Sequence, residues 1–192
     1  MTSVLDSLRY NRCDNMSAFP DWRKYVVKQK RPATGCIPTG YEIILRAMGC
    51  NSVDFITFQD EFDLDKDSQL GDRPRNSFES VARAVQAKYP EVRFTRRAFV
   101  KGEGQKKLEA VQIMISRQQP VLISLALAPF KGKGWHIMPV VDSSADELTL
   151  LWGVDEAGTP QTRLLAKKDL VSIHENFDGG DDIAYLDKRG ET

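Results

Sequence analysis

The sequence predicts an α+β fold in which helices come early and an antiparallel sheet comes late. Three stretches in the first 120 residues carry apolar side chains at helical spacing. Beyond them, three strand-like runs follow one another, at 120–127, 135–141 and 147–154. The segment 142–146 between the last two runs is rich in turn residues, which favours antiparallel pairing.

The first predicted helix spans about residues 37–48. Its apolar residues follow spacings of four, three and four, Pro38 suits a first helical turn, and Gly49 supplies a stop. A second helix is predicted to begin with Asn76 as its capping residue, with Glu79 reaching back, and to end before Pro90.

Further elements complete the predicted domain. A third helix is expected over about residues 105–117, after a glycine-containing turn, and a short one over 168–176. Additional strands are expected within 92–100, 163–166 and 183–186. The chain therefore reads as one domain over residues 1–192, with residues 1–28 as an N-terminal arm.

Composition excludes several classes of protein. The 192 residues contain 27 Lys plus Arg and 27 Asp plus Glu, so the formal net charge is zero and nucleic acid is not the expected partner. No stretch has the length of apolar sequence needed for a signal peptide or a membrane span, so no membrane insertion is expected. Three cysteines are an odd and sparse set, which fits a reducing cytoplasm.

Cys36 and His136 form the most informative pair of residues. Cys36 opens the first predicted helix after the small residues Thr34 and Gly35, where free N–H groups and the helix dipole favour a thiolate. This placement predicts a lowered pKa, and an imidazolium partner at His136 together with the helix N-terminus predicts reactivity already near pH 6. His136 opens an apolar strand after a glycine-rich segment, a position that suits a general base. The remaining histidine, His174, is expected to be a packing or surface residue.

Two short blocks resemble the papain-like cysteine peptidases, nearest the branch that processes double-glycine leader peptides. The first block, residues 29–41, contains a glutamine followed by a cysteine that opens a helix, with Ile37 in place of the usual glycine and Pro38 kept. The second, residues 116–141, places a helix end, a Pro-Val-Leu-Ile strand and the histidine strand in the family's order. The resemblance covers roughly residues 29–175 and implies a papain-like fold, with N-terminal helices packed on a C-terminal antiparallel sheet.

The resemblance also implies roles for individual residues. Cys36 would be the nucleophile, His136 its base, and Gln29 the side chain that donates to the oxyanion. The family orients its histidine with an Asp or Asn, yet Trp152 stands near that position here. Either Asp155 takes that role after a longer turn, which we prefer, or Cys36 and His136 act as a dyad shielded by Trp152.

The predicted function is a thiol hydrolase, a cysteine peptidase that acts on a peptide or protein through an acyl-enzyme on Cys36. No metal or organic cofactor is implied, and the sequence leaves the oligomeric state open. An acyltransferase or transglutaminase-type enzyme with the same Cys36 and His136 pair is one alternative. A catalytically silent peptide-binding module is the other, supported by the absence of an aligned third residue.

Overall fold

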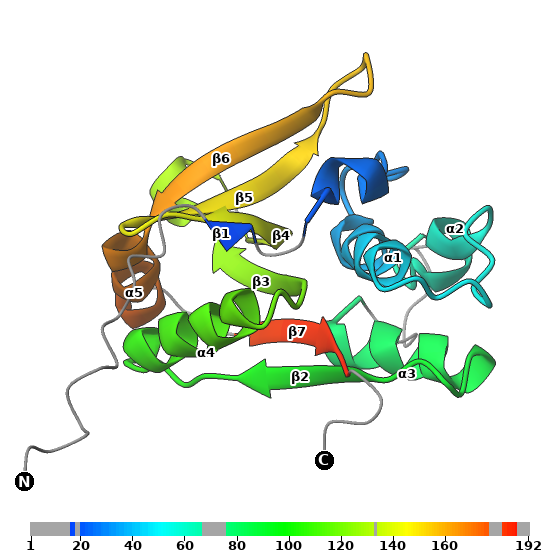
Figure 1. Cartoon of the computed structure of the whole chain (residues 1–192), viewed down its shortest axis with the longest axis horizontal. Helices are drawn as coiled ribbons and strands as arrows, with labels where there is room; N and C mark the ends of the chain where they lie inside the picture. The colour runs from blue at the N-terminus through cyan, green and yellow to red at the C-terminus, as the bar shows by residue number, and fades with distance from the viewer. Residues whose placement is uncertain (1–15, 18–19, 67–75, 133, 177–181, 188–192) are drawn as a thin grey trace, which may run out of the picture.

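The computed structural model describes residues 16–17, 20–66, 76–132, 134–176 and 182–187, and in these the chain forms an α+β fold (Figure 1). Six strands lie side by side in the order β2-β7-β3-β4-β5-β6, and every neighbouring pair is antiparallel. The short strand β1 pairs with the C-terminal end of β4. Their bounds are Met16–Ser17 (β1), Phe94–Ala98 (β2), Val121–Ala126 (β3), Trp135–Ser143 (β4), Glu147–Val154 (β5), Pro160–Ala166 (β6) and Asp182–Leu186 (β7).

Helices precede the sheet and also alternate with its strands. α4 comes between β2 and β3, and α5 between β6 and β7. The predicted helices near residues 37, 105 and 168 are confirmed to within one residue of their predicted ends, whereas α2 was not predicted. The bounds are Trp22–Tyr25 (η1), Cys36–Ala47 (α1), Phe58–Phe62 (α2), Phe78–Lys88 (α3), Gly104–Ser116 (α4), Ala128–Phe130 (η2) and Lys167–Asn176 (α5).

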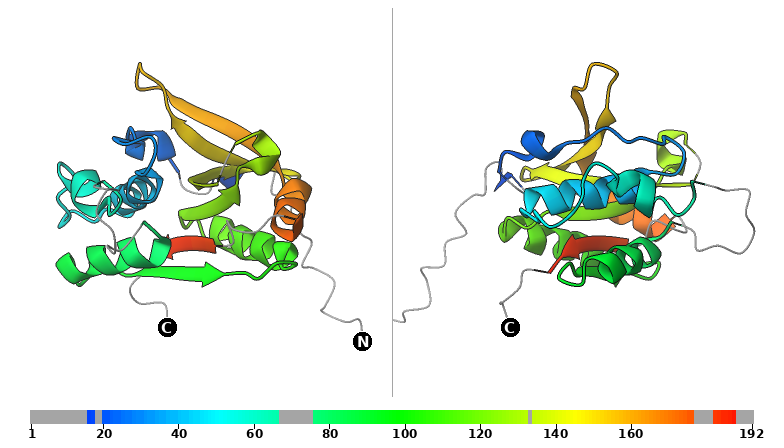
Figure 2. Two further views of the ribbon diagram at one scale, coloured as in Figure 1. Left: turned by 180° about the vertical axis from the view of Figure 1, so that it is seen from behind. Right: turned by 90° about the vertical axis from the view of Figure 1, so that its right-hand side faces the viewer.

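The central strand β3 is buried along its whole length because helices cover both faces of the sheet there. Val121 and Ile123 pack in one apolar cluster with side chains of α4 and α5. Leu122 belongs to a second cluster, with side chains of α1 and α3. A strand covered on both faces carries a continuous apolar run rather than an alternating one, which explains the pattern at 120–127. Figure 2 shows the β5–β6 hairpin projecting beyond this covered part of the sheet.

The N-terminal cap of α3 differs from the predicted one. Ser77, not Asn76, is the capping residue, and its side chain exchanges hydrogen bonds with Ser80 in a capping box. The Asn76 side chain instead donates to the backbone oxygen of Thr34 and to the buried carboxylate of Asp63. Asn and Ser are both residue types suited to capping, and because the Asn76 side chain is engaged in these tertiary contacts, Ser77 caps the helix.

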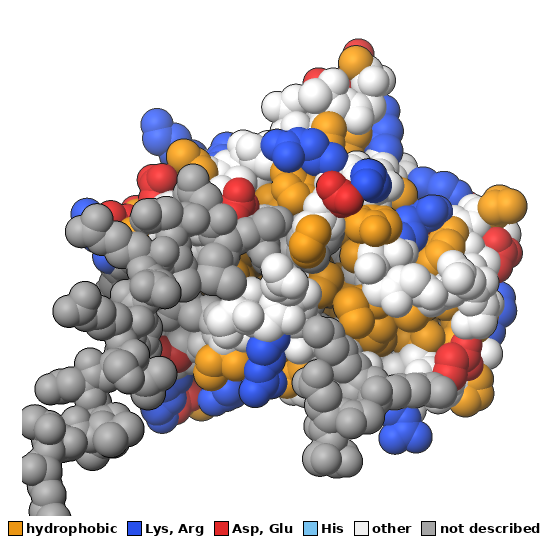
Figure 3. All heavy atoms as spheres, in the orientation of Figure 1, with side chains coloured by type: hydrophobic (Ala, Val, Ile, Leu, Met, Phe, Trp, Pro, Cys, Tyr) orange, Lys and Arg blue, Asp and Glu red, His pale blue; other side chains and the backbone are white. Residues whose placement is uncertain are grey.

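Charged side chains on the face shown in Figure 3 lie at several separate places among apolar and neutral ones. No helix of the described residues is long and apolar enough to cross a membrane.

Candidate active site

A small pocket lies where the beginning of α1 meets β4, β5 and the segment that precedes α1. Gln29, Cys36, His136 and Trp152 are among its lining residues. The pocket has a volume of about 30 Å³, which suits a few water-sized groups rather than a whole ligand. Three of the four predicted site residues therefore come together here from separate parts of the chain.

Cys36 is the first residue of α1, directly after Gly35 at the cap position. A Cβ on Gly35 would lie 3.0 Å from the backbone oxygen of Arg31 and 3.2 Å from Cγ of Gln29, so the chain is tightly packed at this turn. The glycine thus allows the segment that carries Gln29 to approach the start of the helix.

The predicted low pKa of Cys36 is wrong for this environment. Burial raises the pKa of the thiol above its ordinary value, and the nearby charge of Asp63 acts in the same direction. Hydrogen bonding by backbone N–H groups, chiefly that of Ile137 and then that of Ile37, favours the thiolate but is outweighed. The Ile137 N–H belongs to the residue that follows His136, so the thiol lies against the histidine strand.

His136 is half-buried on β4, and burial lowers its pKa from the ordinary value. Its Nε2 lies 3.4 Å from the backbone oxygen of Trp152, a long hydrogen bond in which the ring nitrogen must be the donor. This bond favours the neutral tautomer with hydrogen on Nε2 and a lone pair on Nδ1. The Trp152 indole also packs edge-on against the imidazole, with ring centres 5.4 Å apart.

Gln29 is half-buried and lines the pocket. Its Nε2 donates a 2.7 Å hydrogen bond to the backbone oxygen of Arg31, which uses one of the two N–H groups of the amide. The second N–H is the one that remains for a group bound in the pocket.

Gln59 on α2 holds this segment in place, and sequence reasoning missed it. Its Oε1 accepts from the N–H of Lys30, and its Nε2 donates to the oxygen of Lys28, so the two bonds bracket Gln29. The same amide bonds Thr39 and Glu42 of α1, both buried. Phe58 and Phe62, four residues apart, were the available sequence signal for a short buried helix here.

Asp155 lies in the turn after β5, directly after the last pocket residue, Val154. Its carboxylate accepts hydrogen bonds from the Thr159 N–H at 2.8 Å and from Gln161 Nε2 at 3.0 Å. The structure therefore places Asp155 within the β5–β6 hairpin, and both of these hydrogen bonds stay within that hairpin.

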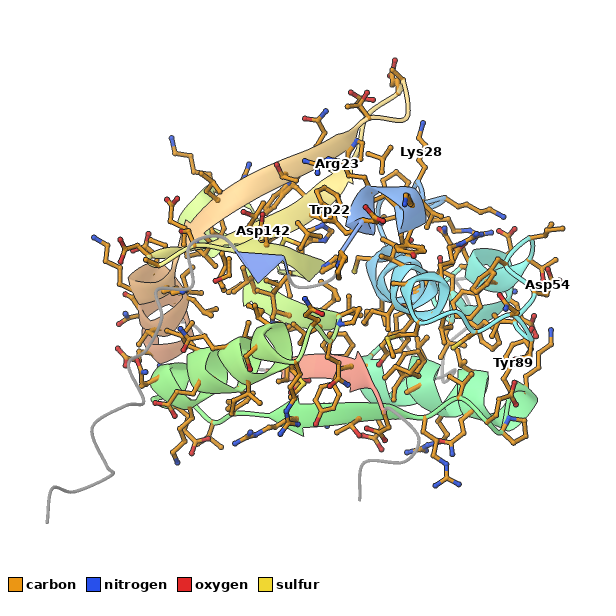
Figure 4. All side chains as sticks on the ribbon, in the orientation of Figure 1. Trp22, Arg23, Lys28, Asp54, Tyr89 and Asp142 are labelled. Atoms are coloured by element: carbon orange, nitrogen blue, oxygen red, sulfur yellow. The ribbon has the colours of Figure 1, made fainter. Side chains whose placement is uncertain are left out.

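An acid and a second cysteine of the described residues lie away from the pocket. Asp142 is at the far end of β4 from His136, where it accepts from the Ser143 N–H (Figure 4). Cys50 follows α1 and lines a different pocket of about 300 Å³ together with Val92 and Leu186. Cys13 lies outside the described residues. Within the described ranges, no group of three or more His, Cys, Asp or Glu side chains is arranged to hold a metal ion.

No model of a known protein family matches this sequence, and no curated protein is significantly similar to it. Among solved structures, the chain is similar to the crystal structure of a candidate C39-like peptidase from Bacillus anthracis. The TM-score is 0.43 and the sequence identity 12%, over 84% of this chain and 94% of that chain.

Proposed function

We propose that this protein is a papain-like thiol hydrolase, a cysteine peptidase that forms an acyl-enzyme on Cys36 with His136 as its base. The observation that carries the proposal is that both side chains line one pocket, with the thiol against the backbone of the residue next to the histidine. The order of Gln29, Cys36 and His136 in the chain supports the papain-like assignment. The double-glycine branch and a cytoplasmic location stay predictions of the sequence.

The reaction begins from a neutral pair. A raised thiol pKa and a lowered imidazole pKa mean that Cys36 holds its proton at neutral pH and His136 has a free lone pair. As Sγ bonds to the substrate carbonyl carbon, Nδ1 of His136 takes the thiol proton. The imidazolium gives this proton to the leaving amine as the C–N bond breaks. Water then attacks the thioester, and the products are a carboxylic acid and the restored thiol.

Gln29 is proposed to stabilise the oxygen that becomes negative in this attack. Its place in the pocket lining and its second N–H support that role. Removal of one such donor typically lowers the rate by about 10²- to 10³-fold.

The histidine is proposed to be oriented by the backbone oxygen of Trp152, so that Cys36 and His136 act as a dyad. The 3.4 Å contact at Nε2 supports this, and it selects the tautomer that the mechanism needs. Asp155 is the competing proposal for a third catalytic residue, and its hydrogen bonds to Thr159 and Gln161 count against it.

The test compares two cysteine variants with the native protein on a pool of peptides, with products identified by mass spectrometry. Cys36→Ala is expected to abolish cleavage, and Cys50→Ala, in the separate pocket, to leave it unchanged. Cleavage that survives Cys36→Ala would contradict the proposal. The same reactions run with an added amine separate hydrolysis from acyl transfer, because a transferase gives the amide product.

A silent peptide-binding module is the second candidate, and the raised thiol pKa is the observation that favours it. It predicts binding of peptides without cleavage by the native protein, and equal affinities for the native protein and Cys36→Ala.

A further inference from the structure

The outer wall of the candidate active site carries an arginine stacked on an aromatic side chain. The guanidinium carbon of Arg163, on β6, lies 3.7 Å from the ring centre of Trp152 and 5.4 Å from that of Phe130. Trp152 lines the pocket, and its ring packs against both His136 and Phe130. The Trp152 indole is therefore in contact with both the arginine and the candidate base.

Arg163 is exposed and has no ion-pair partner among the described residues. Arg46 makes a comparable stack on Phe55, but it is also paired with Glu42. Asp155, an acid of the same hairpin, accepts from Thr159 and Gln161 instead.

Stacking uses the flat face of the guanidinium and leaves its N–H groups free in the plane of the group. These N–H groups match the two oxygens of a carboxylate, and the indole holds the cation in one orientation.

The chemistry of cleavage fixes which part of a substrate reaches Arg163. His136 must protonate the leaving amine, so the residues that follow the scissile bond lie on the side of the imidazole and of Trp152. The two ring contacts place the guanidinium within about 9 Å of the imidazole centre. An extended chain advances roughly 3.3–3.6 Å per residue, so this distance spans the first three residues of the leaving segment.

We propose that Arg163, held on Trp152, binds a carboxylate carried by the first three residues after the scissile bond. The substrate class is then a peptide that is acidic just after the cleavage site, through an Asp or Glu side chain or through its own C-terminus. This inference rests on the proposed function, which sets the direction in which the substrate lies in the site. It adds to that function a residue that determines substrate specificity.

The experiment uses internally quenched peptides of mixed sequence with amidated ends, and cleavage sites are located by mass spectrometry. The native protein should cut peptides with Asp or Glu in those three positions about 5- to 20-fold faster, in kcat/KM, than the Asn or Gln counterparts. Arg163→Gln should abolish this preference, and Arg163→Glu should reverse it in favour of Lys. A parallel set of peptides with free C-termini tests whether the bound carboxylate is the C-terminus of the substrate. Faster cleavage one to three residues before a free C-terminus, lost when that terminus is amidated, would show that Arg163 binds the α-carboxylate.

The matched control is Arg97→Gln, because Arg97 is also an exposed arginine over an aromatic ring, Phe99, but lies on β2 at the other edge of the sheet. This variant should keep the native preference. Equal cleavage of acidic and neutral peptides by the native protein, or an unchanged preference in Arg163→Gln, would overturn the proposal.

A binding measurement separates this proposal from the proposed hydrolase. If no variant cleaves any peptide, the hydrolase is contradicted, and fluorescence anisotropy with the Cys36→Ala protein decides the role of Arg163. Tighter binding of labelled acidic peptides than of their amide counterparts, lost in Arg163→Gln, would support the role. Equal binding, or no binding, would refute it.

Discussion

Replacing Gln59 with leucine removes four hydrogen bonds while keeping nearly the same side-chain volume. The amide accepts from Lys30 N–H at 2.9 Å and from Thr39 Oγ1 at 2.9 Å, and donates to Glu42 at 2.8 Å and to Lys28 O at 3.1 Å. Gln59 itself is only 4% exposed.

Each such bond typically stabilises a fold by about 0.5–1.5 kcal/mol, and buried partners left without a bond cost more. We therefore expect Gln59→Leu to lower the free energy of unfolding by about 3 kcal/mol. For a chain of this size, that change corresponds to a fall in Tm of roughly 6–12 °C.

Thermal unfolding followed by circular dichroism measures this change, and Gln86→Leu on the exposed side of α3 is the control, expected to stay within about 0.5 kcal/mol. Well below the new Tm, Gln59→Leu should also lower kcat by at least about tenfold, because Gln29 loses the bonds that bracket it. A Tm within about 2 °C of the native value would refute the reasoning, since the four bonds would then contribute nothing measurable.

Three further predictions concern the fold and the site. Gly104→Ala places a Cβ 2.5 Å from the backbone oxygen of Val171, so we expect a loss of about 1–3 kcal/mol in thermal unfolding, and native stability would show that the contact relaxes freely. Because its pKa is raised, Cys36 should react with iodoacetamide with a pH midpoint above about 8.5, and a midpoint near pH 6 would contradict the burial argument. Asp155→Ala should keep kcat within about threefold, while a loss of about 10²-fold would make Asp155 the third catalytic residue.

Long elements were predictable because their residues repeat a simple period. β5 has the predicted bounds 147–154, and α1 and α4 each begin one residue before their predicted starts. α2 has five residues, so its only periodic signal is the single spacing from Phe58 to Phe62, and it is held by tertiary contacts such as those of Gln59.

The environment of Cys36 was not predictable from its place in the sequence. At the start of a helix, the free N–H groups stabilise a cysteine thiolate and lower its pKa. This local effect can be predicted from the sequence. The opposing effects are burial and the charge of Asp63, and both depend on parts of the chain that the fold brings to Cys36. The sign of the pKa shift follows from the sum of these effects, so only the fold determines it.

The group proposed to orient His136 shows a second reason why part of the site could not be predicted from the sequence. Counting along the chain from His136 leads to Trp152 at the position where papain-like peptidases carry an Asp or Asn, and a tryptophan side chain has no hydrogen-bond acceptor. The structure brings the backbone oxygen of that same residue to 3.4 Å from Nε2. Every residue has such an oxygen, so a main-chain acceptor cannot be predicted from the residue types in a sequence. The indole is then available to pack between the imidazole and Arg163, a contact that a carboxylate or amide at this position would not provide.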